Sequence, residues 1–137
     1  MPMIDVYAEP GTFPEPANLA SRLAATLMEV EQVPDISLFR NNTAAFVHEC
    51  TVANVEGARG HVRVQVLTNA GALDRDKQLA AVSRLTAVVA EAAGDPDLAD
   101  RTWVLLTESY DGGWGIAGHA NTNDELVSLA RAELAGS

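Results

Sequence analysis

Cysteine is nearly absent from this sequence of 137 residues, in which Cys50 is the single one. One cysteine excludes a disulfide bond within the chain, and without a CxxC pair a structural zinc site is not expected. The three histidines are scattered and show no HxH or HExxH spacing, so they do not indicate a metal site either. We therefore expect a protein without a metal ion.

Long apolar runs are missing as well. No stretch approaches the ~20 apolar residues that a membrane-spanning helix needs. The first ten residues, MPMIDVYAEP, have neither the basic nor the apolar region of a signal peptide. These absences predict a cytoplasmic protein with no membrane partner.

Basic residues are few. Nine lysines and arginines stand against 19 aspartates and glutamates, which gives a net charge of −10. Such a surface repels phosphates, so we expect no nucleic-acid partner. Small anionic substrates remain possible, because a few local arginines can outweigh a distant acidic surface. Apolar residues make up 47% of the chain, which is enough for the core of one domain over residues 1–137.

The chain contains one pattern of elements twice, about 60 residues apart. In the first copy a strand pattern at residues 4–7 runs through a turn into a helical pattern at residues 16–32, and a second strand is expected at residues 44–49. Pro16 suits the first turn of a helix. The apolar stripe of this helix consists of Leu19, Leu23, Leu27 and Val30.

The second copy begins with a strand pattern at residues 62–67. A helix is expected at residues 75–93, with Asp74 as its N-cap and Gly94 at its end, and a fourth strand at residues 103–107. Gly71 follows Gly11 by 60 positions. The expected apolar face of this helix consists of Leu79, Val82, Leu85, Val89 and Ala93.

Two β-α-β units predict an α/β (α+β) fold, with a four-stranded sheet and two helices on one face. Because a helical crossover joins parallel strands, each unit contains one parallel pair. Repeat one spans about residues 2–55, repeat two about 61–118, and a short C-terminal helix about 122–135, opened by the capping box Thr122-x-x-Glu125. Residues 103–106 are apolar on both faces, so identical subunits in a closed ring are expected to cover the other face of the sheet.

The stretch from Val104 to Gly118, VLLTESYDGGWGIAG, resembles the C-terminal part of 4-oxalocrotonate tautomerase. The Met-Pro start is similar to the signature of the tautomerase superfamily. Length and duplication resemble its fused members, malonate semialdehyde decarboxylase and cis-3-chloroacrylic acid dehalogenase. The resemblance implies a tautomerase/MIF-like fold, a homotrimer, no cofactor, and Pro2 as the catalytic base once Met1 has been removed.

The chemistry of Pro2 suits that role. Without Met1 its nitrogen is a secondary amine, and burial in an apolar pocket lowers the pKa of an amine toward neutrality, where a general base works best. The ring fixes φ and so limits the torsional freedom of the lone pair. If Met1 stays attached, Pro2 is an amide and the base is lost.

Two further residues take roles from the resemblance. Trp114 matches the aromatic wall beside the proline, and a core tryptophan is the alternative. Arg40 lies near the place where 4-oxalocrotonate tautomerase has a catalytic arginine, and in a ring of subunits it would reach a neighbour's Pro2; the alternative is a surface arginine. We expect Trp103 to pack in the core.

The substrate-binding candidates are weaker. In the fused members two arginines lie in the loop after the third strand, but here residues 68–74 contain none, and only Asn69 and Arg75 are near. Asn69 can hydrogen-bond a carbonyl but cannot replace a bidentate guanidinium. Tyr110 is a candidate donor to an oxyanion. His48 is expected to be an interior or interface histidine, with catalysis as the alternative.

The leading hypothesis is a tautomerase or isomerase that moves a proton in a small 2-oxo or 2-hydroxy alkenoate or an aryl-pyruvate-like carboxylic acid. No cofactor is required, because side-chain donors can stabilise the enolate. One alternative is a decarboxylase or a hydratase/dehalogenase of the same superfamily, which the missing arginines disfavour. The other is a non-catalytic trimeric scaffold that retains Met1.

Overall fold

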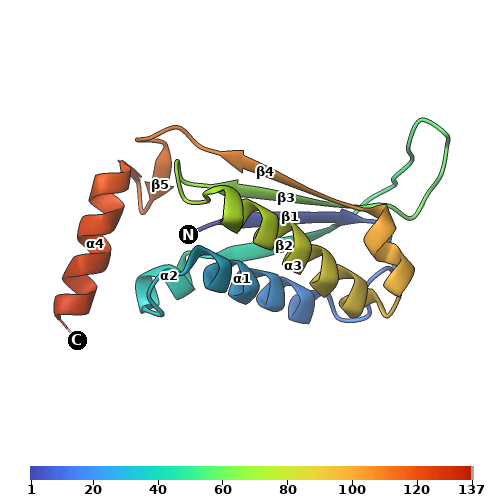
Figure 1. The fold of residues 1–137 in the computed structure, drawn as a ribbon, viewed down its shortest axis with the longest axis horizontal. Coiled ribbons are helices and arrows are strands. Elements are labelled where there is room, and N and C mark those ends of the chain that lie inside the picture. The colour runs from blue at the N-terminus through green and yellow to red at the C-terminus, as the bar shows by residue number, and fades with distance from the viewer. Residues whose placement is uncertain (137) are drawn as a thin grey trace.

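The structure is a computed structural model that describes residues 1–136 (Figure 1). Its elements, in chain order, are β1 Met3–Ala8, α1 Pro16–Glu31, α2 Ser37–Asn41, β2 Ala44–Glu49, β3 Val62–Thr68, α3 Arg75–Ala93, the 3-10 helix η1 Pro96–Arg101, β4 Thr102–Glu108, β5 Trp114–Ile116, β6 His119–Asn121 and α4 Asn123–Ala135.

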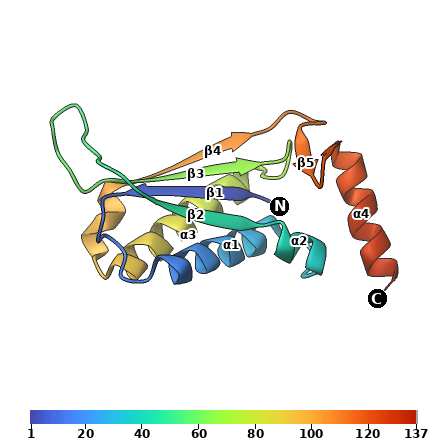
Figure 2. The ribbon, with the colours of Figure 1, turned by 180° about the vertical axis from the view of Figure 1, so that it is seen from behind.

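The main sheet has four strands in the order β2-β1-β3-β4. β1 is parallel to β2 and β3 is parallel to β4, whereas the central pair β1 and β3 is antiparallel. Helices α1 and α3 cover one face of this sheet (Figures 1 and 2). The predicted α/β (α+β) fold with two β-α-β units is therefore confirmed.

The core lies between these two helices and the sheet. Alternate residues of β1 and β3 point into it, as the period of two in a strand requires. The predicted stripe of α1 is confirmed, since all four of its residues are buried. Fully buried core side chains include Ile4, Val6, Val64, Val66, Leu19, Leu23, Leu27, Leu85 and Val89.

The predicted face of α3 is wrong in part. Leu79 and Val82 are 53% and 37% exposed, whereas Ala81, Leu85 and Val89 are fully buried. The buried stripe is therefore rotated toward Ala81. A methyl group at position 81 lets the helix approach the core closely, and this packing overrides the larger apolar residues beside it.

The helix ends follow the sequence signals. The side chain of Asp74 accepts a hydrogen bond of 2.9 Å from the backbone of Lys77, and Gly94 ends α3 in the left-handed conformation with φ of 65°. At the start of α4, Thr122 and Glu125 form the predicted capping box.

Helix α2 was not predicted. Its first two backbone amides, those of Ser37 and Leu38, each donate a 2.9 Å hydrogen bond to the carboxylate of Glu133 in α4. A carboxylate at a helix N-terminus satisfies amides that have no partner within the helix. This contact fastens α4, which stands beyond the end of the sheet, to the rest of the chain (Figure 1).

The second face of the sheet carries no helix (Figure 2). We call it the helix-free face. Trp103, which was expected in the core, lies there with 43% of its surface exposed and stacks on His61. That prediction was wrong for the single chain, because β4 directs Val104 and Leu106, not Trp103, toward the helices. The other large exposed apolar residues on this face are Phe46, Leu67 and Leu105.

The helices within residues 1–136 include none with the length and hydropathy required to cross a bilayer.

Candidate functional site

The N-terminus is buried at the end of the sheet that faces α4 (Figure 1). Pro2 directly precedes β1, which lies between β2 and β3, and is less than 2% exposed. Met1 is 2% exposed and packs in an apolar cluster with Trp114 and Leu126. The first residues of the chain thus lie inside the molecule and not on its surface.

A cavity of about 510 Å³ opens at this place. It lies between the end of α1, the turn after β3 and helix α4. Met1, Phe39 and Leu126 supply apolar lining, and α4 adds Val127 and Ala130. The polar and charged residues that line the cavity are Glu31, Gln32, Asn69, Lys77, Asn123 and Arg131.

Glu31 and the terminal amine of Met1 form a buried pair. The amine nitrogen lies 3.6 Å from Oε1 of Glu31, whose side chain is 3% exposed. That distance exceeds a hydrogen bond, and Oε1 has no hydrogen-bond partner among the described residues. Burial lowers the pKa of the Met1 amine and raises the pKa of the Glu31 carboxyl, because each charged form loses its hydration; the attraction between the two opposes both shifts.

Lys77 reaches the same corner from α3. Its ammonium group donates a 3.0 Å hydrogen bond to the backbone carbonyl of Glu31. The positive charge lowers the pKa of the Glu31 carboxyl and so acts against burial. The corner therefore holds one buried carboxyl group that faces the terminal amine, with the Lys77 ammonium bound to the backbone of the same residue.

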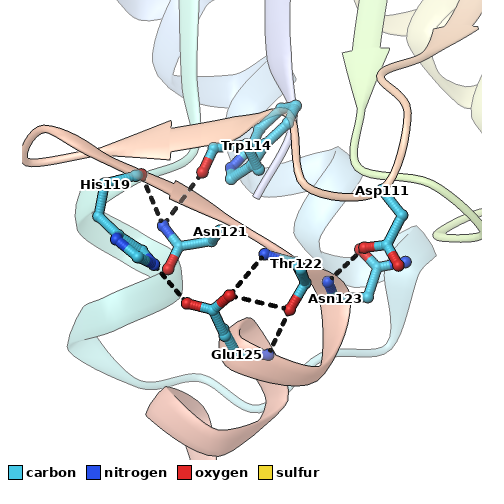
Figure 3. A network of polar contacts seen from close by, with 7 residues as sticks. All are labelled: Asp111, Trp114, His119, Asn121, Thr122, Asn123 and Glu125. Carbon is cyan, nitrogen blue, oxygen red and sulfur yellow. Dashed lines mark hydrogen bonds and ion pairs between the residues drawn. The ribbon is translucent and has the colours of Figure 1, made fainter.

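Asparagines join the turn after β3 to the start of α4. The side-chain amide of Asn69 donates to Oδ1 of Asn123 at 3.2 Å, and that of Asn123 donates to the carbonyl of Ala70 at 2.7 Å. The backbone amide of Asn123 donates to Asp111 at 2.7 Å (Figure 3). These bonds hold one rim of the cavity in place and bring the predicted residue Asn69 to it.

Trp114 lies in the short β5-β6 hairpin and is 6% exposed. The buried side chain of Asn121 donates a 3.0 Å hydrogen bond to the carbonyl of Trp114 and a second bond to His119 (Figure 3). The hairpin is thereby held so that the indole packs against Met1. This position agrees with an aromatic wall beside Pro2, a role that stays a prediction.

Of the predicted site residues only Asn69 lines this cavity; Pro2 and Trp114 lie next to Met1, which does line it. Arg40 is 51% exposed and pairs with Asp35 at 2.8 Å, and it borders a separate hollow between α1 and β2. Arg75 is exposed at the start of α3. Tyr110 is 81% exposed. Within one chain, none of the three is brought together with the N-terminus.

His48 lies on the helix-free face. Its Nε2 is 2.6 Å from Asp5, and its ring stacks on Tyr7 with centroids 4.6 Å apart. The side chain is 43% exposed in the single chain. Its role as an interface histidine stays a prediction.

Sequence reasoning missed Glu31, Lys77 and Arg131. For Glu31 a signal was present: it follows Leu27 by four positions and so continues the buried stripe of α1. Arg131 gave no such signal, because it is a single arginine on a short helix. Arg131 has no ion pair among residues 1–136.

Residues 1–136 contain no group of three or more histidine, cysteine, aspartate or glutamate side chains arranged to hold a metal ion.

Comparison with protein-family models gave no match, and no curated protein matched the sequence. Solved structures do match. A symmetric trimer of a fused 4-OT is similar with a TM-score of 0.73 and 16% identity, over 90% of this chain and 98% of that one. Protein N1, a member of the cis-3-chloroacrylic acid dehalogenase family, matches with a TM-score of 0.71 and 15% identity, over 97% and 99%.

Malonate semialdehyde decarboxylase is also similar, with a TM-score of 0.67 and 16% identity, over 93% of this chain and 98% of that one. At these identities the likeness establishes the fold. The chain has the fold of the tautomerase superfamily over nearly its whole length.

Proposed function

We propose that this protein is a cofactor-independent tautomerase or isomerase in which Pro2, freed by removal of Met1, is the general base. Its substrate is a small 2-oxo or 2-hydroxy alkenoate or an aryl-pyruvate-like carboxylic acid. One observation carries the proposal: the start of the chain lies buried at a cavity of about 510 Å³. Chain termini usually lie at the surface, so a terminus packed inside the molecule beside a cavity is unusual.

The reaction needs only a proton transfer. The nitrogen of Pro2 takes the proton from the hydroxyl group of the enol, the C=C double bond shifts to form the C=O bond, and the prolinium returns a proton to the carbon. Atoms and charge balance without a second reactant. Amide donors such as Asn69, and cations at the rim such as Arg131, stabilise the oxyanion and the carboxylate.

Surroundings of the nitrogen support its role as a base. Trp114 and Leu126 pack against Met1. After removal of Met1, these two side chains form an apolar wall beside the freed nitrogen of Pro2. Burial already lowers the pKa of the terminal amine at this place. A lowered pKa increases the fraction of the amine that is free to accept a proton near neutral pH.

The proposal includes a homotrimer. Phe46, Trp103 and Leu105 leave large apolar surfaces exposed on the helix-free face, and a second layer there would bury them. The fused 4-OT compared above forms a symmetric trimer. In such an assembly Arg40 is the residue proposed to reach a neighbour's Pro2.

The test begins with the intact mass of the purified protein, which reports whether Met1 is removed. Turnover of the enol of phenylpyruvate is then measured for Pro2→Ala and for Pro14→Ala, a matched control at an exposed loop proline. Loss of a general base lowers kcat/KM about 100-fold or more. Pro14→Ala should keep wild-type activity. Equal turnover in Pro2→Ala and the wild type would eliminate Pro2 as the base.

A second candidate is a non-catalytic trimeric protein that keeps Met1. It is favoured by the fit of Met1 itself, which is 2% exposed, packs against Trp114 and directs its amine toward Glu31. A mass that includes Met1, together with no turnover, would support this candidate over the enzyme.

A further inference from the structure

Glu31 is a charged residue in a place where charge is costly. Its side chain is 3% exposed, and Oε1 lacks a hydrogen-bond partner among the described residues. A buried acceptor without a hydrogen-bond partner is destabilising, and more so when it is charged. An apolar residue at this position of α1 would avoid that cost, so the carboxylate needs another explanation.

The carboxylate is directed at the start of the chain. Oε1 lies 3.6 Å from the nitrogen of Met1. Three covalent bonds separate that nitrogen from the nitrogen of Pro2, so the two nitrogens lie within about 4 Å of each other. When Met1 is removed, the cavity extends into the space between Glu31 and Pro2. Contact between Glu31 and the Pro2 nitrogen then requires a shift of the freed chain end or a bridging water.

Charged groups from three elements face this position. Lys77 of α3 binds the backbone carbonyl of Glu31, and Arg131 of α4 lines the cavity. On α1 itself Glu29 pairs with Arg84 and its side chain is 65% exposed. Glu31 is therefore the carboxylate nearest to the terminal nitrogen among the cavity residues, and the other charges that line the cavity are positive.

We propose that Glu31 is a positioning residue of this site: its buried carboxylate faces the nitrogen that begins the mature chain and controls when that nitrogen gives up its proton. For Pro2 as a base, this inference rests on the proposed function. The carboxylate stabilises the protonated amine, whereas the apolar cluster around Trp114 destabilises it. The balance between these two effects decides the pH range in which the nitrogen is free to accept a proton from substrate.

The test replaces the charge and keeps the shape, with Glu31→Gln. Removing a neighbouring anion makes the amine easier to deprotonate, so the acid limb of the kcat/KM profile for enol turnover should move down by about one pH unit, as expected for the loss of a close charge partner. The control is Glu29→Gln, on the same helix, which should leave the profile unchanged. An unchanged acid limb in active Glu31→Gln would overturn the proposal.

A second measurement does not depend on activity. The nitrogen of the terminal residue is titrated by ¹⁵N NMR in the wild type, in Glu31→Gln and in Glu31→Asp, which keeps the charge. A lower midpoint in Glu31→Gln than in Glu31→Asp supports the proposal, and equal midpoints overturn it. If Glu31→Gln does not fold, the wild type is titrated instead. The chemical shift of the Glu31 carboxyl carbon should then change at the pH midpoint of the terminal amine. If the two groups titrate independently, the proposal is overturned.

The two proposals fail in different ways. If the midpoint moves but no enol turnover is found, Glu31 controls the nitrogen and the tautomerase assignment is wrong. If turnover depends on Pro2 and the midpoint does not move, the enzyme stands and Glu31 is only structural. If the mass includes Met1, the same titration follows the Met1 amine, which lies 3.6 Å from Glu31.

Discussion

Nε2 of His48 lies 2.6 Å from Oδ1 of Asp5, across the parallel strands β2 and β1. Both side chains belong to the helix-free face, where 43% of His48 and 33% of Asp5 is exposed in the single chain. Covering this face would remove the pair from water. The pair therefore reports whether the sheet is covered.

We predict that the coupling between these two residues depends on assembly. A half-exposed pair contributes about 0.2–1 kcal/mol, whereas breaking a buried pair costs about 3–5 kcal/mol. A double-mutant cycle with Asp5→Asn and His48→Gln, measured by denaturant unfolding of the assembled protein, should give more than about 1 kcal/mol. A smaller coupling, together with the mass of a monomer from light scattering, would contradict burial of the face.

The two tryptophans should differ in their effect on stability. Trp114 is 6% exposed, so Trp114→Ala should lower the free energy of unfolding by about 3–5 kcal/mol through the cavity it leaves. Trp103→Ala is the matched control, because Trp103 is 43% exposed and should mainly weaken association between subunits. Urea unfolding and sedimentation separate these effects. Equal losses of unfolding free energy would contradict the burial of Trp114 in the cluster with Met1.

The first turn of α4 should respond to acid. The hydrogen bond with His119 is the main reason why the pKa of the Glu125 carboxyl lies below its usual 4.5. Because folding lowers this pKa, the carboxylate stabilises the folded turn above about pH 4.5, and that contribution is lost as the pH falls through the lowered value. Carbon chemical shifts of residues 123–126 should follow this loss in the wild type and not in Glu125→Gln. Asp124→Asn, on the same turn, is the control and should behave as the wild type.

Much of the fold was predictable because it depends on local chemistry. Asp74, Gly94 and Thr122 mark the ends of helices through bonds to residues at most four positions away. The period of the apolar residues gave α1, and the crossover rule gave the parallel pairs. The extent of helix α3 was predicted, but the face that it buries was not. The sequence pattern alone does not decide whether Leu79 or Ala81 faces the core, because that choice depends on packing.

The site was less predictable because its parts meet through distant contacts. Glu133 binds the start of α2 across 95 or 96 positions, and Asn123 binds Ala70 across 53. These bonds decide where α4 stands, and α4 decides that Arg131 lines the cavity. No local pattern contains that information. The predicted residues Arg40, Arg75 and Tyr110 do not line the cavity within one chain, and their roles remain predictions.

The antiparallel pairing of β1 with β3 has a consequence for stoichiometry. Shifting the numbering by 60, as from Gly11 to Gly71, carries Pro2 onto Val62, which is likewise buried at the beginning of a strand. Val62 lies at the opposite end of the sheet, where its nitrogen is an ordinary amide joined to His61. The two β-α-β units thus place the start of a strand at each end of the sheet, but only the start of β1 carries the chain terminus. A covalent probe of this pocket should modify the terminal nitrogen at one equivalent per polypeptide, counted by peptide mapping separately from any label on the Lys77 amine that also lines the cavity, hence three and not six in a ring of three.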